Sequence, residues 1–366
     1  MTEGRRRTIP RLLNVENWSK LLSRGERWFF LSGTLYQLDE EGTADIKKRF
    51  QNHQFPGTSG ALFRRALSLP KKSKTLEAAD CVLISGLGRF GNGVQQFIHA
   101  TSFARALDTS KILYFVNSTA KNDALETGQE FSLIPVRGPF RNAHGYAPHT
   151  IWRSDFFEAG SGFHSFDADA ASSTRTQLQQ LYEDLIDHHV APPETLTIHL
   201  RSGDVFGEKP HPGYGQPPLS FYKAVIEAYD WKSVLIVSED TSNPCLEAVM
   251  NLAAEQGLPC SVSGKSLPDA TRAISRSTNL VASRGTFVPA LLFLSDTPKL
   301  VFTFNGEIDK IPGGETHTYV DVNDVSGYFS ERVLTSNWTN SAEQRALMLE
   351  YPRSNLTTHL EIPSGK

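Results

Sequence analysis

Short apolar runs alternate with amphipathic segments along most of the chain after residue 80. Residues 81–84 form an apolar run ahead of a glycine-rich turn, residues 93–107 carry apolar side chains at near-helical spacing, and residues 112–116 form the next apolar run. This succession predicts a strand, a loop, a helix and a second strand. Strands that alternate with helices in this way open a Rossmann-like parallel sheet.

The same alternation begins again after Pro192–Pro193. The pattern predicts strands at 195–200, 234–237, 279–282 and 300–304, a short extended segment near 261–262, and helices at 219–229, 244–256, 268–275 and 286–294. Between the two series, residues 118–174 have weak periodicity and indicate irregular insertions, and residues 176–189 predict an amphipathic helix.

These patterns predict an α/β protein with two Rossmann-like domains facing a cleft. The expected parts are an N-terminal extension (1–78), a first domain on the acceptor side (79–192), a second domain on the nucleotide side (193–335) and a C-terminal tail (336–366). Ligands of open parallel sheets bind beyond the carboxyl ends of the strands, so we expect the site in the cleft between the domains.

Composition narrows the classes of function. The 366 residues include 37 Lys+Arg and 40 Asp+Glu, a formal net charge of −3, which disfavours nucleic acid as a partner. The 3 cysteines are widely spaced, which disfavours a disulfide framework or a C-x-x-C metal site. No apolar run reaches the length of a signal peptide or a transmembrane segment, and we expect a cytoplasmic protein without a bound metal.

A glycine-rich loop, Gly86-Leu87-Gly88-Arg89-Phe90-Gly91, matches G-x-G-x-x-G between a predicted strand and a predicted helix. Such glycines let backbone N–H groups approach an anion at a helix N-terminus. A dinucleotide site also requires an acid after the second strand, where this chain has Asn117. The alternative is a tight turn that binds nothing.

A second segment, residues 197–204, ends a predicted strand with the sequence T-I-H-L-R-S-G-D. Arg201 at the tip of that strand suits a phosphate, because a guanidinium donates two parallel charge-assisted hydrogen bonds. His199 lies two residues before it and can face the same side. An ion pair between Arg201 and Asp204 that only fixes the loop is the alternative.

Two further constellations follow predicted strands. Ser283-Arg284-Gly285-Thr286-Phe287 begins a predicted helix, whose first N–H groups point toward any anion at that end. Glu239 and Asp240 follow another strand, where they serve either to bind the ribose or base of a nucleotide or to cap the next helix.

These segments resemble, in the same order, the motifs of the fucosyltransferase superfamily of α1,2-, α1,6- and protein O-fucosyltransferases. Residues 86–92 are similar to its G-R-F-G-N loop, with Gly93 where relatives commonly have Gln. Residues 199–204 match H-x-R-x-G-D, and residues 283–287 are similar to its S-x-S/T-F segment. The resemblance spans about residues 81–305. It implies a GT-B-like fold and the inverting, metal-independent transfer of fucose from GDP-fucose to a glycan, a lipid-linked oligosaccharide or a protein hydroxyl.

In that superfamily the arginine binds the β-phosphate of GDP-fucose, a role that the resemblance gives to Arg201. As the base we expect Glu208 first, because it lies in the loop that resembles the acceptor loop, then Asp204, then His211. No cofactor is expected beyond the donor substrate. The residues expected to bind the nucleotide sugar are Gly88, Arg89, Phe90, Gly91, Asn92, His199, Arg201, Ser283, Gly285, Thr286 and Phe287.

Three other functions are compatible with the sequence. The same fold can use a different nucleotide sugar, because no motif marks the residues that contact the base. An NAD-dependent oxidoreductase would use the Gly86–Gly91 loop. A glycan- or nucleotide-binding module without catalysis would show binding but no transfer.

Overall fold

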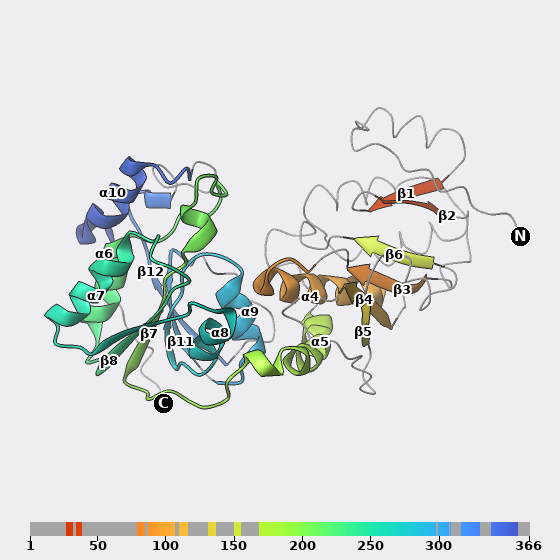
Figure 1. The fold of residues 1–366 in the computed structure, drawn as a ribbon, viewed down its shortest axis with the longest axis horizontal. Helices are drawn as coiled ribbons and strands as arrows, with labels where there is room; N and C mark the ends of the chain where they lie inside the picture. Colours follow the sequence, from red (N-terminus) through yellow and green to blue (C-terminus); the bar gives the residue numbers. More distant parts are fainter. Residues whose placement is uncertain are drawn as a thin grey trace, which may run out of the picture. The chain divides into compact units, whose positions relative to one another are not determined.

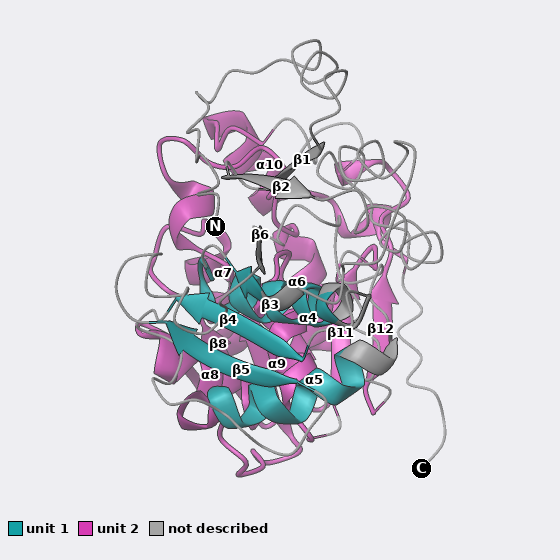
Figure 2. Ribbon diagram, turned by 90° about the vertical axis from the view of Figure 1, so that its right-hand side faces the viewer, with its two compact units in different colours: residues 1–181 teal, residues 182–366 magenta. Residues whose placement is uncertain are grey.

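The computed structural model describes two compact units, residues 1–181 and 182–366 (Figure 2). The division lies between Leu181 and Tyr182, ahead of the domain boundary expected between residues 192 and 193. The residues described are 27–31, 34–38, 79–84, 87–106, 110–115, 131–136, 150–154, 168–297, 299–306, 308, 316–329 and 338–357.

Unit 1 contains a parallel sheet with the strand order β5-β4-β3-β6. Helix α4 follows β3 and packs on β3 and β4, and α5 packs on α4. The strand, loop, helix and strand expected from residue 80 are therefore confirmed. An antiparallel pair, β1 and β2, belongs to the same unit. The elements are β1 (Arg27–Leu31), β2 (Thr34–Leu38), β3 (Ala79–Ile84), α4 (Phe90–Ala106), β4 (Lys111–Phe115), β5 (Ser132–Val136), β6 (Thr150–Ser154) and α5 (Ala168–Leu181).

Two expectations for unit 1 are wrong. Strands β5 and β6 lie in the stretch expected to be irregular; β5 contains Pro135, which weakens the strand pattern, and a sheet tolerates proline on an edge strand such as β5. Helix α5 ends at Leu181, whereas the pattern predicted a helix to residue 189. Beyond it, the Asp187 carboxylate accepts the His189 N–H at 3.0 Å, a local turn that competes with helix.

Unit 2 contains, in its described residues, a parallel sheet with the order β12-β11-β10-β7-β8-β9. Numbered along the chain and listed from β9, this is the doubly wound order 3-2-1-4-5-6. The expected strands and helices of the second series are confirmed, with ends shifted by a residue or two. The elements are η5 (Glu183–Leu185), β7 (Thr195–His199), η6 (Gly203–Phe206), α6 (Leu219–Ala228), β8 (Ser233–Val237), α7 (Cys245–Glu255), β9 (Cys260–Ser263), α8 (Leu267–Ser275), β10 (Asn279–Val281), α9 (Phe287–Leu294), β11 (Leu300–Phe304) and β12 (Thr318–Val322).

Helices cover both faces of this sheet (Figure 1). The chain runs from β7 through β8 to β9, returns to the other side of β7 at β10, and continues to β12. Because parallel crossovers are right-handed, this reversal places α6 and α7 on one face and α8 and α9 on the other. The strand order thus reverses between β7 and β10.

The residues expected to form a C-terminal tail are part of unit 2 as far as Thr357. Helix α10 (Ala342–Glu350) begins with a capping box between Ser341 and Gln344 and packs on α6 and α7, and η8 (Arg353–Asn355) follows it. Trp338 and Met348 are buried in the same apolar core as β7 and β8. Unit 2 therefore needs these residues to complete its core.

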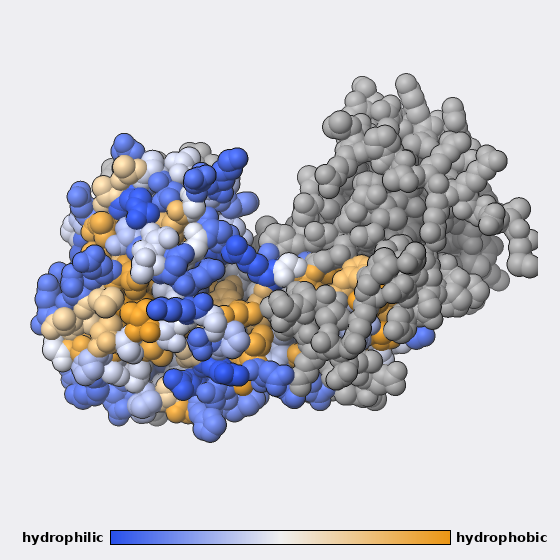
Figure 3. Space-filling model, in the orientation of Figure 1, coloured by the Kyte–Doolittle hydropathy of each residue, from blue (hydrophilic) through white to orange (hydrophobic). Residues whose placement is uncertain are grey.

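Most of unit 2 carries a mixed surface, with hydrophilic residues between apolar patches on the face drawn in Figure 3. Among the described residues, no helix has the length and hydrophobicity needed to cross a bilayer.

The segment before β7 belongs to unit 2 through bonds to the end of α8. The Ala191 N–H donates to the Arg276 carbonyl at 2.8 Å, and the Asp187 N–H donates to Ser275 Oγ at 2.9 Å. Lys299 is buried behind the same helix end, with Nζ donating to the carbonyls of Ser275, at 2.7 Å, and Ser277. Burial lowers the pKa of Lys299 to about 7.

We predict that Lys299 makes unit 2 more stable as the pH rises. Its pKa is about 7 when folded and near 10.5 when unfolded, so between these values the unfolded chain binds more protons and stability increases with pH. The slope is up to about 1.4 kcal/mol per pH unit. Urea unfolding from pH 6 to pH 10 should show this rise in the wild type and lack it in Lys299→Met; parallel profiles of the two proteins would contradict the assignment.

Candidate functional site

The segment around Arg201 and the segment around Gly285 meet where the strand order of unit 2 reverses. Arg201 follows β7, and the segment Ser283–Thr286 follows β10 and leads into α9. Strands β7 and β10 are neighbours, with Ile198 in register with Val281. In open parallel sheets, ligands bind beyond the carboxyl ends of the strands at this point of reversal.

The Arg201 guanidinium lies over the ring of Tyr214, with Cζ 4.2 Å from the ring centroid. Its Nη1 donates to the Arg284 carbonyl at 3.4 Å, and its Nη2 lies 3.6 Å from Asp204 Oδ1. A guanidinium has five N–H donors, and these two contacts within the described residues are both long. Arg201 is thus oriented by stacking and retains donors for an anion.

Gly285 allows this placement of the guanidinium. It adopts a φ of +135°, and a Cβ on it would lie 1.9 Å from Arg201 Nη1. Helix α9 begins two residues later, at Phe287, and a helix N-terminus carries a partial positive charge. The Arg201 guanidinium and the N-terminus of α9, both electropositive, are therefore neighbours, and a bound anion would stabilise this arrangement.

His199 and Ser283 join the two strand ends. His199 Nδ1 lies 2.7 Å from Ser283 Oγ, which also accepts the Arg201 backbone N–H at 3.2 Å. The His199 ring packs on Phe287 with centroids 5.3 Å apart. Burial, with the Arg201 charge, lowers the pKa of His199 to about 3, so the ring is neutral near pH 7. These contacts favour a positioning role for His199 over direct contact with a ligand.

The three candidate bases lie in the loop after β7. Asp204 forms an ion pair with Arg201, as in the alternative interpretation of the sequence. Glu208 is exposed. His211 is also exposed, and its ring packs 4.9 Å from that of Tyr214. The lone pair of His211 Nδ1 accepts the Gly213 N–H at 3.1 Å, which occupies one possible proton acceptor. The choice of base stays a prediction.

Asp240 links the loop after β7 to the loop after β8. Its Oδ1 accepts hydrogen bonds from Ser202 Oγ, from the Ser242 N–H at 2.8 Å and from the Gly203 N–H at 3.4 Å. Burial by itself would raise the pKa of Asp240, and these bonds outweigh it and hold the pKa below its usual value. The cap of α7 comes instead from Asn243, whose Oδ1 accepts the Cys245 N–H at 2.9 Å.

Three supporting residues carry no motif in the sequence. The Asn243 side chain donates to the Arg201 carbonyl at 2.8 Å, and the Tyr214 ring carries the Arg201 guanidinium. Trp338 holds the loop after β7, since its Nε1 donates to the Val205 carbonyl at 2.6 Å and its backbone N–H to the Pro212 carbonyl at 3.1 Å. An aromatic residue or an amide in a loop gives no periodic signal, so sequence patterns could not select them.

The glycine-rich loop of unit 1 has the form that its sequence predicts. Gly88 has a φ of +65°, and α4 begins at Phe90, which is buried, so that Gly91 and Asn92 lie in its first turn. Arg89 is exposed, and its carbonyl accepts the Gly93 N–H at 2.8 Å. The loop follows β3, next to the reversal between β3 and β6 in this sheet. Gly86 and Asn117 lie outside the described residues.

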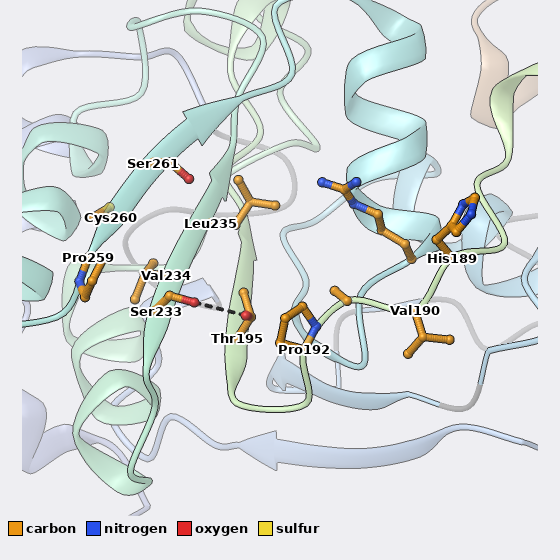
Figure 4. Close-up of a pocket in the computed structure, with 12 residues that line it drawn as sticks. His189, Val190, Pro192, Thr195, Ser233, Val234, Leu235, Pro259, Cys260 and Ser261 are labelled. Atoms are coloured by element: carbon orange, nitrogen blue, oxygen red, sulfur yellow. Dashed lines mark hydrogen bonds between the residues drawn. The ribbon is translucent and has the colours of Figure 1, made fainter.

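A pocket of about 450 Å³ lies at the opposite, amino edge of the unit 2 sheet, near the starts of β7, β8 and β9 (Figure 4). The hydroxyl groups of Thr195 and Ser233 lie 2.9 Å apart there and bond to each other. Arg276 also lines it, and its Nη1 lies 3.8 Å from an Asp187 carboxylate oxygen. Because these polar groups pair within the protein, the pocket is a weaker candidate than the carboxyl edge.

No group of three or more His, Cys, Asp or Glu side chains able to hold a metal occurs among the residues described. The metal-independent chemistry expected from the sequence resemblance stays a prediction.

The close approach at Gly285 yields a prediction. In Gly285→Ala the new Cβ would displace the Arg201 guanidinium, and we expect the affinity for pyrophosphate to fall about tenfold or more, the loss expected for one charge-assisted hydrogen bond. The matched control is Gly257→Ala, where φ is +69° and nothing lies within 4 Å of the added Cβ. Both variants should lose stability, on the order of 1–2 kcal/mol from backbone strain. Isothermal titration that finds equal binding in both variants would refute the role of Gly285.

A second prediction concerns Trp338. Trp338→Phe keeps an aromatic ring beside Phe206 and removes the bond to the Val205 carbonyl, at a cost of about 1 kcal/mol. Trp231→Phe is the control, because Trp231 Nε1 donates to the Val225 carbonyl at 3.0 Å away from the loop. Hydrogen exchange should accelerate at residues 203–214 in Trp338→Phe and not in Trp231→Phe. Similar exchange there in both variants would show that Trp338 does not hold the loop.

Comparison with known proteins gives a weak structural likeness. No protein-family model and no curated protein matches the sequence. Among solved structures, the chain is similar to the ADP-heptose LPS heptosyltransferase II of E. coli, with 14% sequence identity and a TM-score of 0.33 over 66% of this chain and 90% of that one. At these values, neither the substrate nor the site of that enzyme transfers to this chain.

Proposed function

We propose that the protein is a glycosyltransferase that takes a sugar from a nucleotide-sugar donor. One observation carries the proposal. The Arg201 guanidinium, which has N–H donors available, lies next to the N-terminus of α9 at the point where the strand order of unit 2 reverses. A diphosphate suits this place, because it accepts from the guanidinium and from backbone N–H groups at the same time.

The chemistry follows from the charge that develops during transfer. Breaking the bond between sugar and phosphate leaves negative charge on the departing nucleoside diphosphate. Arg201 and the first turn of α9 would stabilise that charge, and removal of one such donor typically costs about 10²–10³ in rate. The acceptor hydroxyl loses its proton to a base in the loop after β7, with Glu208 as the first candidate.

The finer assignment rests on the sequence motifs. The resemblance at His199, Arg201 and Asp204 favours GDP-fucose as the donor and inversion at the sugar carbon. The acceptor is a hydroxyl of a glycan, a lipid-linked oligosaccharide or a protein. In this proposal the Gly88–Asn92 loop of unit 1 serves the acceptor side.

A thermal-shift panel tests the donor class. Ligands that bind only the native state raise its stability, so GDP and GDP-fucose should raise the melting temperature more than UDP, CMP or NAD species. Stabilisation by a different nucleotide sugar would support the assignment as a transferase and would change the assigned donor. Stabilisation by NAD(H) alone would favour an oxidoreductase that uses the Gly86–Gly91 loop, and GDP binding without transfer to any acceptor would favour a non-catalytic module.

We predict that Arg201→Ala lowers the transfer rate by about 10²–10³ or more and leaves unit 2 folded. The control is Arg276→Ala, which removes a partly exposed arginine from the amino edge of the same sheet. Transfer of labelled fucose from GDP-fucose, with far-UV circular dichroism of both variants, measures the effect. Full turnover by Arg201→Ala would refute the diphosphate role.

A further inference from the structure

The loop after β8 places an acid level with Arg201. His199 and Val237 are in register at the ends of β7 and β8, and the Leu200 N–H donates to the Val237 carbonyl at 2.9 Å. Arg201 and Glu239 each follow two residues after this pair. The two side chains therefore leave neighbouring strands at the same level of the carboxyl edge.

The Glu239 carboxylate lies against the backbone of the Arg201 loop. A Cβ on Gly203 would lie 2.4 Å from Glu239 Oε2, and Gly203 has a φ of +65°. A glycine at this position thus leaves the space that the carboxylate occupies. Since Gly203 follows Arg201 by two residues, the acid and the guanidinium border the same loop.

Glu239 and its neighbour Asp240 differ in what they bind. Asp240 accepts hydrogen bonds from Ser202, Gly203 and Ser242, which fix the loops. Glu239 is exposed, and within the described residues it accepts no hydrogen bond and forms no ion pair. Asp240 is therefore a structural residue, and the carboxylate of Glu239 is available to a ligand.

The position of Glu239 in the sheet indicates which ligand group it suits. In chain order β8 is the second strand of the doubly wound sheet, and in dinucleotide-binding sheets of this order an acid after the second strand accepts a hydrogen bond from a ribose hydroxyl. A carboxylate beside a phosphate site would repel a bare anion, whereas its two oxygens can accept bonds from neighbouring hydroxyl groups. The acid thus favours a nucleoside diphosphate over inorganic pyrophosphate.

We propose that Glu239 binds the ribose 2′- and 3′-hydroxyl groups of the nucleoside diphosphate whose phosphates contact Arg201. This assignment rests on the proposed function, because it requires a nucleotide at the Arg201 site. It makes the loop after β8 a determinant of specificity, one that selects ribonucleotides.

Isothermal titration with three ligands tests this role in the full chain. The ligands are whichever of GDP, ADP and UDP stabilises the protein most, the 2′,3′-dideoxy form of that nucleotide, and pyrophosphate. The wild type should bind the ribonucleotide about tenfold or more tightly than the dideoxy form, the size expected for hydrogen bonds to a charged group. Glu239→Ala should bind both alike and bind pyrophosphate at least as tightly as the wild type. The matched control is Glu255→Ala, at the far end of α7.

The outcomes separate this assignment from the proposed function. If Glu239→Ala keeps the preference for the ribonucleotide, or if the wild type has none, Glu239 does not bind ribose. The proposed function then stands as long as Arg201→Ala loses both nucleotide and pyrophosphate binding. A wild type that binds none of the three ligands overturns the proposed function and this assignment together.

Discussion

The contact between the Arg201 guanidinium and Gly285 requires strands that are far apart in the chain to be neighbours. Arg201 follows the first strand of unit 2, and Gly285 follows the fourth, so they meet because the chain returns across β7 to form β10. Only a residue without a Cβ leaves room for the guanidinium at this junction. The reversal of the sheet brings the cation to a helix N-terminus, and the candidate chemistry of unit 2 depends on that placement.

Successive sets of contacts hold the backbone that carries the guanidinium. His199 and Ser283 link the two strand ends, and their bond is buried, where hydrogen bonds are hard to replace with water. Asn243 holds the Arg201 carbonyl, and Asp240 ties the next loop to it. These contacts fix the backbone, and the Tyr214 ring orients the Arg201 side chain before a ligand arrives, which lowers the entropy lost on binding.

Sequence patterns predicted much of the architecture and the two motifs that meet at the carboxyl edge. Periodicity located β7 through β11 because buried strands and amphipathic helices follow regular spacings, and the spacing of H-x-R-x-G-D placed Arg201 at a strand tip. The same approach missed β5, whose proline breaks the strand pattern, and α10, which was assigned to a tail. It also could not separate Glu239 from Asp240, because only the fold shows which carboxylate the loops already use. Tyr214 and Trp338 act through tertiary contacts that leave no local pattern.

The contacts of Trp338 and Asn340 have a consequence for the order in which the protein forms. Asn340 donates to the Phe206 carbonyl at 2.7 Å, beside the bonds from Trp338 to the same loop. The N-terminal part of a chain leaves the ribosome first, so Arg201 and its loop emerge well before the residues that hold them. During synthesis the nascent protein therefore carries its key arginine on an unsupported loop, and the site matures only when the last part of unit 2 has been translated.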